Sequence, residues 1–229
     1  MSFNKYYSDE TLQDAVDAGR HRQVVGGLWD EMGALQLNFL KDQGMAPRDV
    51  LLDIGCGTLR LGRLAVDYLD PGNYWGADRS ALLLDTGHER ELTDDGRDRL
   101  PRAQLIETDS FDFSAVTARV TYAMAQSVFS HLPLNHLRRC LIKLAEVMPP
   151  TGRFCVTYFE CPDAWPVTEP IQHGRKKGEI VSYDYKDPFH YRPADLLWAA
   201  GHGPWRLERV GDWGHPRGQH MAVFVRGRD

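Results

Sequence analysis

The apolar and polar positions of this chain predict short buried strands that alternate with helices. We expect helices over 21–43, 61–69, 80–92 and 133–148, most of them with apolar residues at steps of three and four. Between these segments lie short apolar runs that we expect to be strands: 50–52, 74–78, 103–107, 120–125 and 154–159. This alternation predicts an α/β fold with a mainly parallel sheet and helices on both faces.

The last third of the chain departs from this alternation. Residues 160–192 are rich in proline, glycine, tyrosine and charge and show no clear period. A loop of this length in a compact domain is more often functional than idle. A short helix is expected over 193–200, and strands are expected over 206–210 and 221–225, as an antiparallel pair joined by the 211–220 loop.

One stretch, VLLDIGCGTLRLG at 50–62, combines a strand, a glycine-containing loop and the start of a helix. Glycine allows a sharp backbone turn and lets a ligand approach the backbone closely. The exposed N–H groups at the start of the helix favour a negatively charged or polar ligand. The stretch therefore predicts a nucleotide-type site.

Acidic residues follow the first three predicted strands: Asp53, Asp78 and Asp109. Ligands of open α/β sheets bind beyond the carboxyl ends of the strands, so we expect these acids to line one crevice. At the end of the second strand, the Asp78 carboxylate is suited to accept hydrogen bonds from a ribose diol. Asp109, Ser110 and Phe111 are candidates to bracket an adenine ring.

Over roughly residues 45–160 the chain resembles the class I S-adenosylmethionine-dependent methyltransferases. Four motifs in the family's order carry this resemblance: Asp53-Ile54-Gly55-Cys56-Gly57-Thr58, Gly76-Ala77-Asp78-Arg79-Ser80, Glu107-Thr108-Asp109-Ser110-Phe111 and Gln126-Ser127-Val128-Phe129-Ser130-His131-Leu132. The implied fold is Rossmann-like, with a mainly parallel seven-stranded sheet. The implied cofactor is S-adenosyl-L-methionine (SAM), and the implied activity is methyl transfer.

By this resemblance, Gly55 and Gly57 pass under the methionine part of SAM, Asp78 holds the ribose, and Asp109 and Ser110 approach the adenine. Arg79 stands where an apolar residue is common, which puts one adenine contact in doubt. The candidate cofactor-binding residues are Asp53, Gly55, Cys56, Gly57, Thr58, Asp78, Arg79, Asp109, Ser110, Phe111 and Gln126.

The same resemblance suggests how a single methyltransferase domain over 1–229 is organised. Residues 1–45 are expected to be a helical lead-in or lid, and 46–160 the cofactor-binding core. Residues 160–205 are expected to be an insertion on the acceptor side, and 206–229 the terminal strand pair.

A dinucleotide-binding enzyme is the main competing interpretation of the glycine loop. Its G-x-G-x-x-G fingerprint requires glycine at position 60, where this chain has Arg60. An acidic residue two positions before the first glycine, as Asp53 is, also suits a methionine amine better than a pyrophosphate. The cationic sulfonium of SAM fits an acidic crevice, whereas a pyrophosphate does not.

Composition limits the cellular setting and the partners. With 229 residues, 42% hydrophobic and 26% charged, one globular domain is expected, and a net charge of −5 gives no general attraction for nucleic acid or anionic lipid. No apolar run approaches the roughly 20 residues of a membrane span, and the N-terminus is too polar for a signal peptide. The four cysteines form no C-x-x-C pair. We expect a cytoplasmic protein without a metal site, and no oligomer is indicated.

The acceptor is inferred mainly by elimination. Enzymes that methylate exocyclic base amines usually carry an Asn/Asp-Pro-Pro-aromatic run after the fourth strand, where this chain has Gln126-Ser127-Val128-Phe129. Cys155 and Cys161 lack the arrangement expected for cytosine C5 chemistry. A small-molecule or glycan acceptor, methylated on oxygen or nitrogen, is therefore favoured. The alternatives are a nucleic-acid methyltransferase and a protein that binds SAM without catalysis.

His131 is the candidate catalytic residue, because the loop after the fourth strand lies beside the transferring methyl group in this family. A general base is needed when the acceptor must lose a proton. The alternative is that His131 caps the helix near Pro133 or bonds to the backbone.

The candidate acceptor-binding residues are Tyr158, His215, Arg217 and Trp29, and each has a structural alternative. Tyr158 and Trp29 are also compatible with ordinary packing, and the 212–221 segment with a solvated loop. Arg217 is suited to clamp a carboxylate or phosphate. The basic run at 173–177 is suited to grip an anionic acceptor or nucleic acid, and a solvated loop is the alternative.

Overall fold

The computed structural model describes residues 9–174 and 180–227 of the chain. The chain divides into two compact units, Met1–Met124 and Ala125–Asp229, with the boundary inside a strand.

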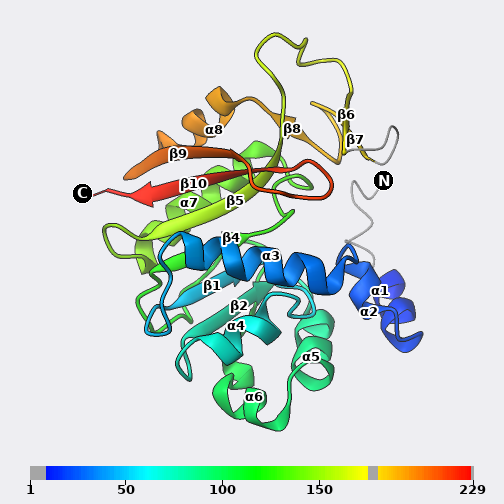
Figure 1. Cartoon of the computed structure of the whole chain (residues 1–229), viewed down its shortest axis with the longest axis vertical. Helices are drawn as coiled ribbons and strands as arrows, with labels where there is room; N and C mark the ends of the chain where they lie inside the picture. The colour runs from blue at the N-terminus through cyan, green and yellow to red at the C-terminus, as the bar shows by residue number, and fades with distance from the viewer. Residues whose placement is uncertain (1–8, 175–179, 228–229) are drawn as a thin grey trace. The chain divides into compact units, whose positions relative to one another are not determined.

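The first unit is built on four parallel strands in the order β3-β2-β1-β4 (Figure 1). Their bounds are β1 Leu51–Ile54, β2 Tyr74–Asp78, β3 Leu105–Glu107 and β4 Tyr122–Ala125. The helices are α1 Asp9–Asp17, α2 His21–Val24, α3 Trp29–Asp42, α4 Gly62–Tyr68, α5 Ala81–Arg90 and α6 Asp94–Arg99. β1 and β4 are buried along their whole length, as expected of parallel strands whose two faces are both covered. The predicted alternation of strands and helices is confirmed.

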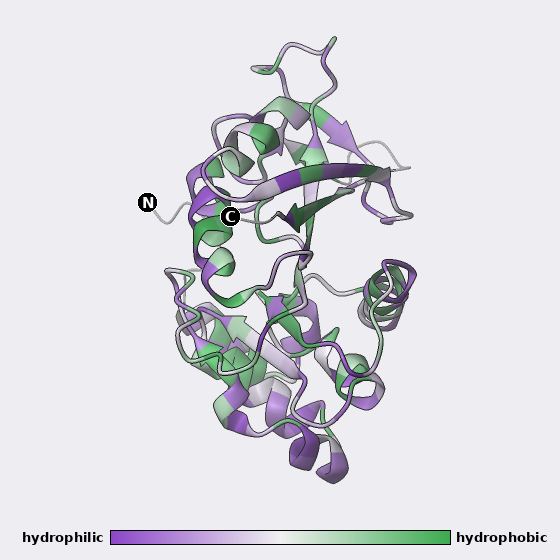
Figure 2. Ribbon diagram, turned by 90° about the vertical axis from the view of Figure 1, so that its left-hand side faces the viewer, coloured by the Kyte–Doolittle hydropathy of each residue, from purple (hydrophilic) through white to green (hydrophobic). Residues whose placement is uncertain are grey.

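The second unit holds an antiparallel set, β5-β10-β9. β5 spans Arg153–Glu160, β10 His220–Arg226 and β9 Trp205–Asp212, with α7 at Leu134–Val147 and α8 at Pro193–Ala200. Figure 2 shows polar and apolar residues alternating along β9, while β10 is almost continuously apolar, in keeping with a solvent-facing β9 and a buried β10. The predicted terminal pair is therefore confirmed, as are all seven expected strands.

Residues 160–192 contain more regular structure than their sequence suggests. β6 Ile171–His173 pairs antiparallel with β7 Ile180–Ser182, and β8 His190–Tyr191 adds to β5 in parallel. Each of these strands has only two or three residues, which is too short for a hydrophobic period to appear in the sequence.

Two predictions about the first unit were wrong. The single helix expected over 21–43 is broken between α2 and α3, because Gly26, Gly27 and Leu28 adopt φ values of 95°, 61° and 48°. Between the helix expected over 80–92 and the strand expected over 103–107, where no element was predicted, the chain forms α6. Its N-cap is Thr93, whose hydroxyl accepts a hydrogen bond of 3.0 Å from the Gly96 N–H.

None of the helices in the described ranges combines the length and the apolar character needed to cross a membrane. The four cysteines at 56, 140, 155 and 161 are all buried and free.

Candidate functional site

The glycine loop after β1 is held against the end of β2. The N–H groups of Gly55 and Cys56 donate to the carbonyl of Ala77 at 2.7 and 3.2 Å. Gly55 and Gly57 have φ values of 71° and 54°, which side-chain-bearing residues rarely adopt. The two glycines therefore shape a tight turn whose backbone a ligand can approach.

Asp78 connects the end of β2 to this loop. One carboxylate oxygen accepts from the Gly57 N–H and the other from the Ser80 N–H, each at 3.0 Å. Burial raises the pKa of the Asp78 carboxyl, and these backbone donors work in the opposite direction. The residue is half-buried, which is compatible with contact between its carboxylate and a ribose diol.

Asp53 lies inside β1 and not on an open crevice wall. It is 3% exposed, and one of its oxygens accepts a 2.9 Å hydrogen bond from the Tyr74 hydroxyl. Burial raises the pKa of Asp53 to about 7, while the Tyr74 hydrogen bond and the positive charge of Arg60 limit the rise. The carboxyl is therefore balanced between its neutral and charged forms near neutral pH.

Two further loop residues are also buried. Cys56 packs against β2, where a Cβ on Gly76 would lie 2.9 Å from its sulfur, and burial raises the pKa of its thiol. Thr58 is fully buried, and its hydroxyl has no hydrogen-bond partner among the described residues. A buried hydroxyl without a partner is costly, so a ligand that supplies one is favoured here.

The adenine segment forms a compact loop after β3. The Thr108 hydroxyl accepts from the N–H groups of Ser110 and Asp112 at 3.3 and 3.0 Å. Asp109 is exposed and Ser110 half-buried, whereas Phe111 is buried and meets Phe113 edge-on at 6.5 Å. Arg79 is half-buried beside Asp78 and lowers the pKa of that carboxyl.

Val25 and Arg60 are residues whose roles the sequence did not reveal. The Arg60 guanidinium donates to the carbonyls of Val25 and Gly27 at 3.0 and 3.2 Å. A Cβ on Gly57 would lie only 2.6 Å from Val25 Cγ1. In the sequence, Arg60 indicated only that position 60 is not the third glycine of a dinucleotide fingerprint. In the structure, it connects the segment between α2 and α3 to the glycine loop.

Trp29 fits the packing interpretation. The ring is 8% exposed and lies between the guanidinium groups of Arg22, at 5.2 Å, and Arg63, at 5.8 Å. Both contacts are cation–π interactions, which stabilise the start of α3.

In the second unit, His131 forms a short ion pair with Asp187 through its Nδ1 atom. The side chains of His131 and Asp187 are 24% and 16% exposed, so the pair is partly accessible. The N-cap residue of α7 is Pro133, whose side chain makes no cap hydrogen bond. Asp187 lies in the 160–205 segment, where nothing in the local sequence singled it out.

Backbone contacts fix Asp187 beside His131. The Phe189 N–H donates to the Ser130 carbonyl at 2.7 Å, and the Tyr191 hydroxyl donates to the Leu132 carbonyl at 2.8 Å. The two acceptor residues, Ser130 and Leu132, flank His131 in the chain. The segment 187–191 therefore runs alongside the loop after β4, and we call this segment the strap.

A buried polar network surrounds Gln126. The Nδ1 atom of His215 accepts from the Arg217 and Gln219 N–H groups at 3.1 and 3.4 Å. Its Nε2 atom lies 3.1 Å from the amide nitrogen of Gln126, which also donates to the Ser127 hydroxyl at 2.9 Å. The amide oxygen of Gln126 is buried and has no hydrogen-bond partner within the described ranges.

The 212–221 segment is not a solvated loop. His215 and Gln219 are 8% and 3% exposed, and the Gln219 side chain accepts from the Ser127 hydroxyl at 3.0 Å. Arg217 is half-buried.

Tyr158 lies in the core and is fully buried. Its hydroxyl donates to Glu160 at 2.6 Å, and His220 and Arg209 pair with the same carboxylate. These partners lower the pKa of Glu160, while burial and the Glu160 contact raise the pKa of Tyr158. The packing alternative for Tyr158 fits this position better than acceptor binding.

The basic run at 173–177 is described only at its start. His173 is buried, bonds to the Ser182 hydroxyl at 2.6 Å and has a pKa lowered to about 4 by burial. Residues 175–177 lie outside the described part of the chain.

Comparisons with known proteins indicate which family has this arrangement of residues at the strand ends. Residues 52–154 match a family model described as a methyltransferase domain. The family match and the fold together support a class I SAM-dependent methyltransferase. The matched range covers the glycine loop, Asp78, the adenine segment and His131.

Solved structures support the fold. The methyltransferase CcbJ from Streptomyces caelestis is 17% identical, with a TM-score of 0.61, over 88% of this chain and 97% of that chain. DesVI from Streptomyces venezuelae is 19% identical, with a TM-score of 0.58, over 96% and 99%. The glycopeptide N-methyltransferase MtfA, complexed with SAM, is 16% identical, with a TM-score of 0.60, over 86% and 94%.

The cofactor of this methyltransferase is SAM, and the first unit fits it. The glycine loop offers backbone free of Cβ atoms, Asp78 offers a half-buried carboxylate, and Thr58 has a buried hydroxyl without a partner.

Proposed function

We propose that this enzyme transfers the methyl group of SAM to a hydroxyl of a small-molecule or glycan acceptor, with His131 as the general base. The observation that carries this proposal is the pairing of His131 with Asp187. A carboxylate at Nδ1 favours the tautomer with the proton on Nδ1 and the lone pair on Nε2. That lone pair is the one needed to take a proton from the acceptor.

The reaction is an in-line displacement at a carbon that SAM supplies already activated by its sulfonium. The enzyme's residues then contribute positioning and proton transfer. His131 Nε2 accepts the acceptor's proton as the oxygen attacks, and Asp187 stabilises the imidazolium that forms. An amine that binds in its neutral form needs no base for the attack, so the dyad favours oxygen over nitrogen as the methylated atom.

Gln126 and Arg217 are the residues that we assign to ligand contacts in the second unit. The Gln126 amide has a buried oxygen without a partner among the described residues, and a ligand that donates a hydrogen bond would satisfy it. His215 fixes this amide and has a supporting role, and Arg217 is suited to an acidic or phosphorylated acceptor.

The structural neighbours support a small acceptor, because one of them is a glycopeptide N-methyltransferase and another is a magnesium protoporphyrin IX methyltransferase. Nucleic-acid methylation and SAM binding without turnover are the two alternatives. A cytoplasmic location is part of the proposal and is supported by the four free cysteines.

The test uses His131→Ala and Asp187→Asn, with His202→Asn as a control that removes an exposed histidine elsewhere in the second unit. Release of S-adenosylhomocysteine is measured with a metabolite extract as the acceptor source, and SAM affinity by calorimetry. His131→Ala is expected to slow turnover by about 10²- to 10⁴-fold at unchanged SAM affinity. A normal rate in His131→Ala would refute the base assignment.

Asp187→Asn separates a positioning role from a merely structural one. It keeps the shape of the side chain but removes its charge, so we expect a lower kcat with little change in KM. Nitrogen NMR of the imidazole is expected to show the Nδ1–H tautomer of His131 in the wild type and a mixture in the variant. An unchanged tautomer and an unchanged kcat would remove Asp187 from the mechanism.

A further inference from the structure

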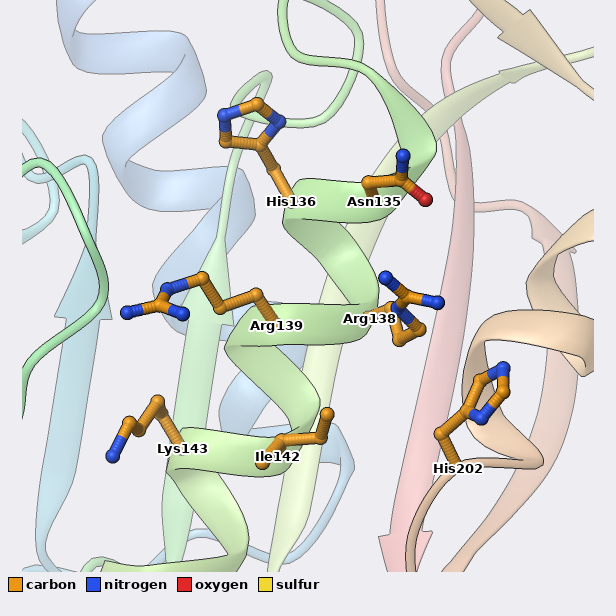
Figure 3. Close-up of a pocket in the computed structure, with 7 residues that line it drawn as sticks. All are labelled: Asn135, His136, Arg138, Arg139, Ile142, Lys143 and His202. Carbon is orange, nitrogen blue, oxygen red and sulfur yellow. The ribbon is translucent and has the colours of Figure 1, made fainter.

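The outer face of α7 carries a groove of about 450 Å³, which we call the α7 groove (Figure 3). It is lined by Asn135, His136, Arg138, Arg139, Ile142, Lys143 and His202. The first six come from two turns and a half of α7, and His202 follows α8. None of these residues has been assigned a role in the methyl-transfer site.

The charge of the α7 groove is opposite to that of the chain. Two arginines, one lysine and two histidines line it, and no carboxylate does, although the net charge of the chain is −5. In Figure 3, His136, Arg139 and Lys143 project to one side of α7, while Arg138 lies on the side of His202. Glu146 pairs with Lys143 at 3.0 Å from one turn further along and partly offsets its charge.

Exposed apolar side chains accompany these cations. Ile142 lines the groove and Trp198 lies against Arg138, and they are 43% and 45% exposed. Leu197, the neighbour of Trp198 in α8, is 56% exposed. The Arg138 guanidinium lies 5.2 Å from the centre of the Trp198 ring, and His202 meets that ring edge-on at 5.0 Å. An arginine stacked on an exposed tryptophan beside aliphatic residues is typical of energetically important positions in protein interfaces.

We propose that the α7 groove docks an acidic amphipathic helix of a partner protein. An amphipathic helix binds a groove through apolar anchors spaced by three, four or seven residues. Here Ile142, Leu197 and Trp198 would receive its anchors, while carboxylates on the flanks of that helix would meet Arg138, Arg139 and Lys143. The charge complementarity argues for an acidic partner and would speed its association at low salt.

Two other occupants fit less well. A symmetric dimer through this face would bring two copies of the same cations together, because a twofold interface pairs one surface patch with itself. Sequence-tolerant nucleic-acid binding relies on bases stacking on aromatic rings. The contacts place a single tryptophan ring against the cations of the groove, whereas successive bases would need a row of rings.

The experiment measures binding of a dye-labelled synthetic helical peptide, with leucines on one face and glutamates on its flanks, by fluorescence anisotropy. The variant is Arg138→Glu/Arg139→Glu. The control is Arg48→Glu/Arg119→Glu, which makes the same charge change at two exposed positions outside the groove. Because side-chain charge reversal on a helix surface can disturb folding, circular dichroism of each variant is compared with that of the wild type, and Trp198→Ala provides a second, uncharged probe.

We expect saturable binding that weakens about tenfold or more in Arg138→Glu/Arg139→Glu, weakens in Trp198→Ala and is unchanged in the control. No saturable binding to the wild type, or equal binding to the charge-reversed variant, would overturn the proposal. Preferential binding of a single-stranded DNA oligonucleotide, or self-association that the variant abolishes, would also overturn it in favour of nucleic acid or a second copy of this chain. Methyl transfer is not needed for this readout, so its outcome is independent of the proposed function.

Discussion

Asp78 is the residue on which the cofactor assignment depends most. Its two oxygens organise the Gly57 and Ser80 N–H groups, and it remains reachable from solvent. We predict that Asp78→Ala weakens SAM binding by about 1–3 kcal/mol, the range for losing hydrogen bonds to a charged group. Calorimetry measures this, with the exposed Asp98→Ala as the control. Unchanged affinity in Asp78→Ala would refute the ribose assignment.

Asp53 makes stability depend on pH in an unusual direction. Its pKa is about 7 in the folded protein, against 3.8 for an unperturbed carboxyl, so the folded state retains a proton that the unfolded state has lost. Its contribution to the free energy of unfolding therefore falls as the pH rises from about 4 to about 7.

Asp53→Asn removes this dependence and keeps an oxygen that can accept from Tyr74. We predict that the variant and the wild type have similar stability at pH 4, and that the variant is more stable at pH 8 by up to about 4 kcal/mol. Urea unfolding at the two pH values measures the difference. A difference that does not change with pH would contradict the raised pKa.

At the scale of single residues, the sequence predicted which residues belong to the site, but it did not predict what surrounds each of them in the fold. The acids after the strands were found from their positions, but the burial of Asp53 depends on Tyr74, which lies 21 residues away. Asp187 is 56 residues from His131, and only the folded strap brings them together. Contacts between distant residues have no local signal in a single sequence.

Among the contacts between elements, the one between the glycine loop and the segment that joins α2 to α3 leads to a prediction about two glycines. Gly57 and Gly27 both have positive φ, 54° and 61°, but a Cβ would collide with Val25 only at Gly57 and would meet nothing within 4 Å at Gly27. The two positions therefore separate backbone strain from a steric clash.

We predict that Gly27→Ala destabilises the protein by about 1 kcal/mol, the cost of the left-handed conformation, and leaves SAM affinity nearly unchanged. Gly57→Ala is expected to cost more and to weaken SAM binding, because Val25 or the loop must move. Thermal unfolding and calorimetry measure both effects. Equal effects of the two substitutions would show that the Val25 contact is unimportant.

The α6 helix offers a simple test of its cap. Removal of the Thr93 hydroxyl in Thr93→Ala leaves the Gly96 N–H without its acceptor, and we predict a loss of about 1 kcal/mol in the free energy of unfolding. Chemical denaturation measures this loss. Thr117→Ala, at an exposed position, serves as the control, and equal stability of the two variants would contradict the capping role.

Element prediction succeeded where the hydrophobic period was long. The α7 helix and the seven expected strands follow from their patterns, because buried elements repeat apolar residues. The prediction failed at α6, whose sequence DDGRDR has no apolar face, and at the α2–α3 break, where backbone angles at Gly26 and Gly27 override the period.

For the whole molecule, the sequence already indicated the fold class and the cofactor. Four different motifs stand at the ends of strands in the order that the family has them. The acceptor was not indicated. Three of the candidates for acceptor binding and catalysis, His131, His215 and Arg217, lie on loops of the second unit. The network of Gln126, Ser127, His215 and Gln219 in that unit forms only after folding.

The most direct test of the account supplies the enzyme with methyl-labelled SAM and a fractionated cell extract and follows the label. The account predicts label in the small-molecule or glycan fraction, with one S-adenosylhomocysteine released per methyl group and strongly reduced transfer by His131→Ala. Label in nucleic acid, or tight SAM binding without any transfer, would contradict it.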